Sequence, residues 1–72
     1  MEYVILRDEE TGEIEKLGRF GENWLQERFY QGEWIWDEIL YSELFDGLLE
    51  EISEEEAEKI IAQMLEREKI AA

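Results

Sequence analysis

The sequence predicts a small α+β domain, in which a small antiparallel sheet built from two N-terminal hairpins is packed by two C-terminal helices. In the N-terminal half, short apolar runs alternate with glycine-containing segments, which is typical of hairpins. In the C-terminal half, apolar residues recur every three or four positions, which is typical of amphipathic helices. The length adds a third observation: 72 residues without a linker or repeat make residues 1–72 a single small acidic domain.

The first hairpin is predicted from residues 3–6, an apolar run that is rich in β-forming residues and too short for a helix by itself. A polar segment follows, in which Gly12 can take the positive φ that a hairpin loop needs. Ile14 and Leu17 mark a weaker second strand. We expect this strand to end near Gly18 and residues 18–21 to form a loop.

Residues 24–30 admit two interpretations. As a helix, the segment would have Asn23 as its N-cap, with Leu25 and Phe29 four residues apart on one face. As a strand, it would pair with residues 34–36 across a turn that contains Gly32. A glycine is costly inside a helix, and residues 34–36 are aromatic and β-branched. We therefore favour a second hairpin, and the helical interpretation remains the alternative.

Two helices are expected after the hairpins. Asp37 is the predicted N-cap of the first helix, which we expect to continue past Gly47 towards Glu51. Its apolar positions are Leu40, Tyr41, Leu44, Phe45 and Leu48. The second helix begins with a capping box of Ser53 and Glu56. Its apolar stripe consists of Ala57, Ile60, Ile61, Met64 and Leu65.

The first strand has apolar side chains on both of its sides. Alternate residues of a strand point to opposite faces, yet both Tyr3 with Ile5 and Val4 with Leu6 are apolar pairs. We expect two short helices to cover only one face of the sheet. The other face would then need a cover, which predicts a homodimer or a different partner.

The charge of the chain limits its partners. Twenty-one acidic and seven basic residues give a net charge of −14, which repels bare nucleic acid and anionic membranes and attracts basic protein surfaces. Three Trp, three Tyr and three Phe indicate that this acidic chain folds. Neither a basic start nor a membrane-length apolar run is visible, so we expect a cytoplasmic protein without membrane contact.

Residues for catalysis or metal binding are not evident. The chain has no His and no Cys, which removes the commonest general base, the commonest metal ligand and every thiolate site. Carboxylate pairs such as Glu27 and Asp37 arise by chance in so acidic a chain, and no nucleophile stands beside them. Residues 50–58 lack the spacing and turn glycine of a Ca²⁺-binding loop. We expect no enzyme, no cofactor and no metal site.

Two sets of residues are candidates for partner binding. The first is an acidic face that could imitate the phosphates of a duplex, although a solvated surface explains it equally: Glu43, Glu50, Glu51, Glu54, Glu55, Glu58, Glu66 and Glu68. The second is an aromatic patch of residue types that dominate binding hot spots, although core or homodimer packing would use the same residues: Trp24, Arg28, Trp34 and Trp36.

These features predict a non-enzymatic small acidic protein that docks on a basic protein surface. Its sharper form is a nucleic-acid mimic that inhibits a nucleic-acid-binding protein. In charge and size the chain is similar to small acidic inhibitors of nucleic-acid-binding enzymes, a likeness that covers no motif. The alternative function is a structural or accessory protein that forms a homodimer or a larger assembly through its aromatic sheet face.

Overall fold

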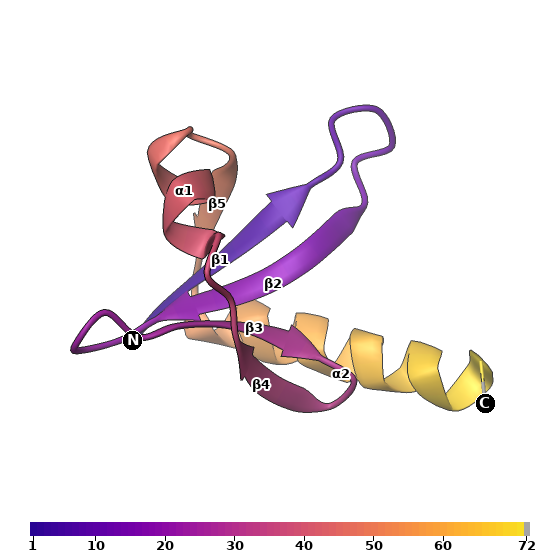
Figure 1. The fold of residues 1–72 in the computed structure, drawn as a ribbon. Coiled ribbons are helices and arrows are strands. Elements are labelled where there is room, and N and C mark those ends of the chain that lie inside the picture. The colour runs from indigo at the N-terminus through magenta and orange to yellow at the C-terminus, as the bar shows by residue number, and fades with distance from the viewer. Residues whose placement is uncertain (72) are drawn as a thin grey trace.

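The computed structural model describes the backbone of residues 1–71 and the side chains of residues 1–68. It consists of a five-stranded antiparallel sheet and two helices (Figure 1). The elements in chain order are β1 (Glu2–Arg7), β2 (Ile14–Phe20), β3 (Gln26–Tyr30), β4 (Glu33–Trp36), α1 (Leu40–Phe45), β5 (Leu49–Ile52) and α2 (Glu54–Ala71). The strand order is β4-β3-β2-β1-β5, which confirms the predicted α+β class and the two N-terminal hairpins.

The second hairpin confirms the strand interpretation for residues 26–30, whereas residues 24 and 25 belong to the connection before the strand, and the helical alternative is wrong. β3 pairs with β4 from Glu27 opposite Trp36 to Tyr30 opposite Glu33. The two residues between the strands, Gln31 and Gly32, have φ of 48° and 82°. Positive φ at both central residues defines the tight turn whose twist matches that of the strands it joins.

The expected loop at residues 18–21 is wrong, because residues 18–20 belong to β2 and pair with both β1 and β3. Gly18 is explained by packing. A Cβ at this position would lie 2.9 Å from a methyl carbon of Leu40, so the absence of a side chain lets α1 approach the sheet. The glycine marks a close approach of two elements, and the chain reverses a few residues later.

The first predicted helix is also wrong in its length and its cap. α1 is six residues long, and Asp37 lies before it: the Asp37 carboxylate accepts a hydrogen bond from the backbone N–H of Ile39 at 3.1 Å. The helix ends because Gly47 takes a φ of 74°. There the N–H of Gly47 donates to the Leu44 carbonyl, and the next N–H donates to the Glu43 carbonyl, which is a Schellman ending. The chain then enters β5, a strand that the sequence did not predict.

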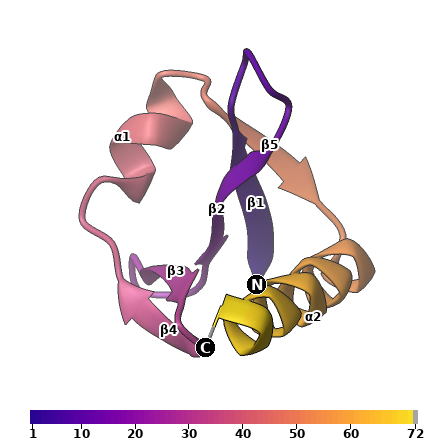
Figure 2. The ribbon, with the colours of Figure 1, turned by 90° about the vertical axis from the view of Figure 1, so that its right-hand side faces the viewer.

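The expectation that both helices cover one face of the sheet is wrong. α1 packs on one face, where Leu40 joins Val4 and Phe20 in a buried cluster. α2 packs on the opposite face, where Ala57 joins Ile5 and Leu17 (Figure 2). The edge strand β5 follows α1 and leads into α2. It therefore carries the chain from the face that α1 covers to the face that α2 covers. Each face of the sheet therefore packs against a helix, which removes the reason for predicting a second copy over one bare face.

α2 follows the prediction closely. The backbone N–H of Glu56 donates to the Ser53 hydroxyl at 3.1 Å, which is the serine half of the predicted capping box. Four residues of the predicted stripe pack in the cluster on this face: Ala57, Ile60, Ile61 and Met64. The fifth, Leu65, remains 42% exposed beside the β3–β4 turn.

Candidate partner-binding site

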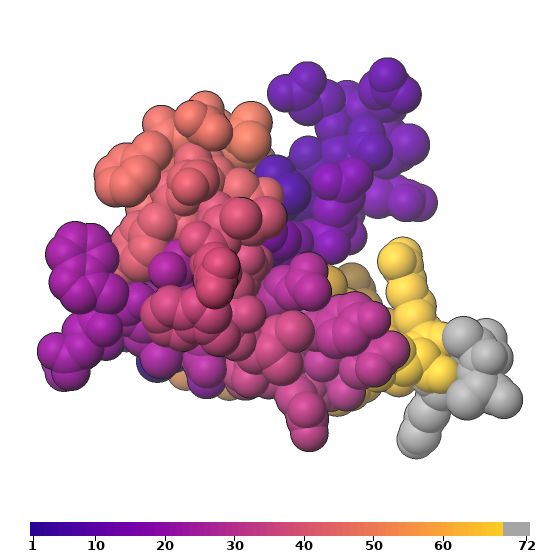
Figure 3. Space-filling view, in the orientation of Figure 1, coloured from indigo at the N-terminus to yellow at the C-terminus, as the bar shows by residue number. Residues whose placement is uncertain are grey.

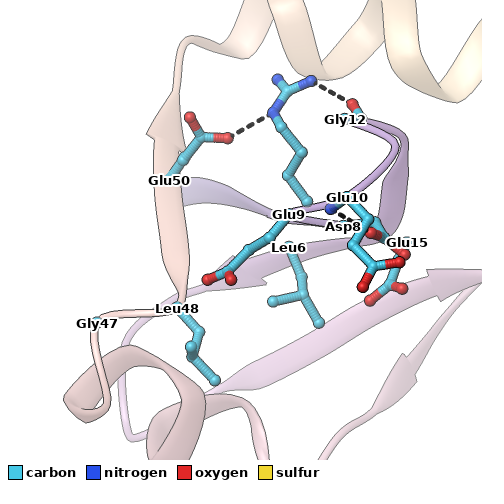
Figure 4. Close-up of a pocket in the computed structure, with 10 residues that line it drawn as sticks. Leu6, Asp8, Glu9, Glu10, Gly12, Glu15, Gly47, Leu48 and Glu50 are labelled. Atoms are coloured by element: carbon cyan, nitrogen blue, oxygen red, sulfur yellow. Dashed lines mark hydrogen bonds and ion pairs between the residues drawn. The ribbon is translucent and has the colours of Figure 1, made fainter.

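An open hollow lies between the tip of the β1–β2 hairpin and the segment that joins α1 to β5 (Figures 3 and 4). Its volume is about 850 Å³ and it is open to solvent. Leu6 and Leu48 supply its apolar part. The acidic part consists of Asp8, Glu9, Glu10, Glu15 and Glu50. We call these seven residues together with Arg7 the acidic hollow.

Local backbone structure places the carboxylates of the acidic hollow. The carboxylate of Asp8 accepts hydrogen bonds from the backbone N–H groups of Glu10 at 2.8 Å and Thr11 at 3.2 Å, which folds the hairpin tip. These bonds lower the pKa of Asp8 below its ordinary value of 3.8. Glu15 is the extra residue of a β-bulge, since Leu6 pairs with Lys16 and the next residue of β1 pairs with Ile14. The folded hairpin tip and the bulge therefore fix the positions of Asp8 and Glu15 in the hollow.

Among the described residues, Arg7 is the one basic residue that lines the acidic hollow, and it is already engaged. Its Nε donates to the Glu50 carboxylate at 2.9 Å, and its Nη1 donates to the Gly12 carbonyl at 2.7 Å. These two bonds tie β5 to the hairpin tip (Figure 4), and they engage one of the five carboxylates that line the hollow. The other four carboxylates of the hollow form no ion pair among the described residues.

The structure does not bring the eight residues of the predicted acidic face together. Glu50 lines the acidic hollow, while Glu51 is its exposed neighbour on the opposite side of β5. The others that remain exposed lie on α2: Glu54, Glu55, Glu58, Glu66 and Glu68. Sequence reasoning missed four of the five carboxylates in the hollow. The signal that could have found them is the acidic run at residues 8–10 beside a predicted hairpin turn.

Glu43 stands apart from the other predicted acidic residues, because it is nearly buried. Lys16 Nζ donates to Glu43 Oε1 at 2.5 Å and to Asp37 Oδ2 at 2.8 Å, and no more than 14% of any of the three side chains is exposed. Burial alone would lower the pKa of Lys16, but its hydrogen bonds to both carboxylates and their charges outweigh burial and raise it. Glu43 therefore joins α1 to β2.

The four residues of the predicted aromatic patch are also dispersed. Trp34 is half-buried on the α2 side, in edge contact with Phe29 and with the Arg19 guanidinium 4.1 Å from its ring centroid. Trp36 is exposed on the edge strand β4. Arg28 points to the other face, 5.2 Å from the ring centroid of Tyr30. Trp34 therefore packs partly against the buried cluster on the α2 side of the sheet.

Trp24 is the exception, because it lies in a second apolar surface that the sequence did not reveal. It stands on the turn between β2 and β3 and contacts the edge of Tyr41 on α1, with ring centroids 5.6 Å apart. Leu44 and Phe45 extend this surface along α1, and both are exposed. We call Trp24, Tyr41, Leu44 and Phe45 the aromatic surface; in Figure 3, the β2–β3 turn and α1 lie beside each other.

Neither a metal centre nor a membrane span is found among the described residues. No group of three or more carboxylates there is arranged to hold a metal ion, and no helix there combines the length and apolarity needed to cross a bilayer. In comparisons with known proteins, the chain matches no family model, no curated protein and no solved structure.

Proposed function

We propose that this protein is a non-enzymatic binding protein that docks on a basic protein surface. The observation that carries the proposal is the acidic hollow, which is lined by five carboxylates, two leucines and an arginine that is already bonded within the chain. The hollow is lined by five carboxylates and one guanidinium, and a cationic partner would balance this excess of negative charge. The net charge of −14 adds long-range steering towards such a partner.

The apolar part of the hollow fits the same kind of partner. Lysine and arginine side chains bury their aliphatic stems on apolar surface while the charged ends reach carboxylates. Leu6 and the exposed Leu48 offer that apolar surface between the carboxylates of the hairpin tip and Glu50. A protruding Lys or Arg of a partner would use both parts of the hollow. Association is then fast and weakened by salt.

The sharper form of the proposal, nucleic-acid mimicry, rests on the carboxylates along α2. Lys59 and Arg67 interrupt that helix with positive charge. A phosphate array carries no such interruption. The acidic hollow supports basic-surface binding in general, and competition by DNA or RNA for a captured partner distinguishes the mimic.

The proposal is tested with a charge-only probe, a peptide of alternating Lys and Gly, whose affinity is measured by calorimetry at several NaCl concentrations. The Glu9→Lys/Glu10→Lys variant is compared with Glu58→Lys/Glu66→Lys, which has the same net charge and alters exposed α2 positions. We expect the hollow variant to bind about tenfold more weakly than the helix variant. Equal losses would show that net charge alone attracts the peptide.

The natural partner is sought by affinity capture from the native host lysate, with elution by a salt gradient. Release of a basic protein at modest salt supports the proposal, and displacement of that protein by DNA or RNA supports the mimic. Recovery of only non-basic proteins that stay bound through high salt contradicts it. Sedimentation of the free protein tests the alternative function, a homodimer or assembly: with both sheet faces covered, we expect a monomer.

A further inference from the structure

The turn between β2 and β3 holds an exposed tryptophan in a backbone conformation that tryptophan disfavours. The N–H of Leu25 donates to the Glu22 carbonyl at 3.2 Å, and the two residues between them, Asn23 and Trp24, have φ of 58° and 63°. Such a turn prefers Asn followed by Gly, because a side chain in the left-handed region is crowded by its own backbone. Asn23 follows this preference and Trp24 departs from it.

Packing within the chain does not explain why tryptophan occupies this left-handed position of the turn. Trp24 remains 74% exposed although one edge of its ring contacts Tyr41. A residue held in an unfavourable conformation while burying little of its surface is a candidate for a role outside folding. Tryptophan is the side chain most enriched at the centres of binding interfaces.

Trp24 belongs to a continuous apolar area. Tyr41 stacks on Phe45 with ring centroids 6.4 Å apart, and Phe45 is 81% exposed. α1 uses Leu40 to cover the sheet, which leaves Leu44 and Phe45 turned to solvent. Tyr41 also packs against the buried cluster, with its ring centroid 4.7 Å from that of Phe20, so Trp24, Leu44 and Phe45 are the part of the aromatic surface that the fold leaves exposed.

The charges that flank the aromatic surface identify the chemistry of its partner. At one end, Leu44 and Tyr41 line a hollow of about 340 Å³ whose charged side chains are those of Glu2 and Glu22, and Met1 with its ammonium group lines it as well. At the other end, α1 runs through Gly47 into the acidic hollow. An apolar strip with carboxylates at both ends is complementary to apolar side chains flanked by cations. A second copy of this chain would instead bring its own carboxylates against them.

We infer that the aromatic surface is the apolar anchor of the proposed docking interface, and that it binds a cationic amphipathic helix of a basic protein. Aliphatic side chains of the partner lie on Trp24, Tyr41 and Phe45. Its Lys and Arg residues reach Glu2 and Glu22 at one end and the acidic hollow at the other, and one of them can stack on the Trp24 ring. This inference rests on the proposed function and adds the partner's apolar side chains to it.

Two synthetic peptides of equal length and charge test the inference. The first has Leu at helical three- and four-residue spacing among Lys residues, and the second has Ser in place of each Leu. We expect the wild-type protein to bind the Leu–Lys peptide at least about tenfold more tightly than the Ser–Lys peptide. Trp24→Gly and Phe45→Ser should each abolish most of that preference and leave the affinity for the Ser–Lys peptide unchanged.

The matched control is Trp36→Ser, which removes an equally large exposed ring from β4, away from the aromatic surface. We expect it to keep the preference for the Leu–Lys peptide. Trp24→Gly should retain or raise the thermal midpoint, because Asn-Gly suits the turn. A loss of binding in this variant would then not reflect unfolding.

The outcomes separate the inference from the proposed function. Salt-sensitive binding of both peptides without a preference for leucine overturns the inference and leaves the function standing. A leucine preference that survives Trp24→Gly and Phe45→Ser also overturns it. Failure of both peptides to bind overturns the function as well. A concentration-dependent dimer that Phe45→Ser dissociates would assign the aromatic surface to a second copy of this chain.

Discussion

The ammonium group of Lys16 lies 2.8 Å from a carboxylate oxygen of Asp37, and at most a tenth of either side chain is exposed. The pair joins the centre of the sheet to the segment that leads into α1, and Glu43 on α1 accepts a second bond from the same ammonium. One cation therefore holds two carboxylates at the base of the helix that carries the aromatic surface.

Lys16→Met should destabilise the protein by about 3 kcal/mol, because it leaves buried carboxylates without their cation. This value is at the lower end of the range for breaking a buried pair, since a tenth of the Lys16 side chain is still exposed to water. The free energy of unfolding is measured by urea denaturation. Lys59→Met, at an exposed position on α2, is the control and should change it by less than about 0.5 kcal/mol. Equal losses of unfolding free energy in the two variants would mean that the buried contacts of Lys16 contribute no stability beyond that of one positive charge.

The hairpin tip should lose stability in acid because of Asp8. Its backbone hydrogen bonds hold the folded-state pKa below 3.8, so the ionised group stabilises the fold above that pH. This contribution is lost as the pH falls through the lowered value. We expect the difference in unfolding free energy between wild type and Asp8→Asn to be constant from pH 7 to 6 and to shrink below pH 3.8. A difference that grows in acid would contradict the assignment.

Gly18→Ala should destabilise the protein by about 1–3 kcal/mol, because the new methyl group would lie 2.9 Å from a Leu40 methyl carbon and 3.3 Å from Val4. A double-mutant cycle separates this overlap from strand propensity. In a Leu40→Ala background, where the space is vacant, we expect the same substitution to be neutral or stabilising. A penalty of equal size in both backgrounds would show that the approach of α1 is not its cause.

Added salt should stabilise the fold, because the net charge of −14 works against compactness. Raising NaCl from about 0.01 to about 0.1 M shortens the screening length from about 30 to about 10 Å, which is enough to weaken repulsion across a domain of this size. We expect the denaturation midpoint to rise over that range. Comparison with sodium sulfate at equal ionic strength separates screening from salt exclusion, and a flat or falling midpoint in NaCl would contradict the prediction.

The parts of the fold that the sequence predicted are those set by nearby residues. The turn at Gly32 and the cap at Ser53 act within a few residues of themselves, and the second hairpin and α2 were found. β5 was missed because Leu44 and Leu48 continue a helical spacing, while the strand depends on pairing with β1 more than 40 residues away. Gly18 was misread because its reason is the Leu40 side chain, which local sequence does not contain.

The candidate site, too, was predictable only where residues close in the sequence determine it. The acidic run at the hairpin tip is visible in the sequence, but it becomes part of a hollow only because β5 brings Leu48 and Glu50 beside it. Trp24 was predicted to bind a partner, whereas its neighbours Tyr41 and Phe45 were assigned to a helix stripe. Exposure of that stripe depends on the helix being six residues long, and the Schellman ending at Gly47 sets that length.

The strand order has a consequence for the order of folding. β1 is made first, but it lies between β2 and β5, and its second edge stays unpaired until residue 52 has joined the sheet. The hairpins can form from contacts close in sequence, while closure of β5 on β1 requires the whole intervening chain. Until β5 docks, the chain therefore exposes one unpaired edge of β1, and this first strand is among the last to be completed.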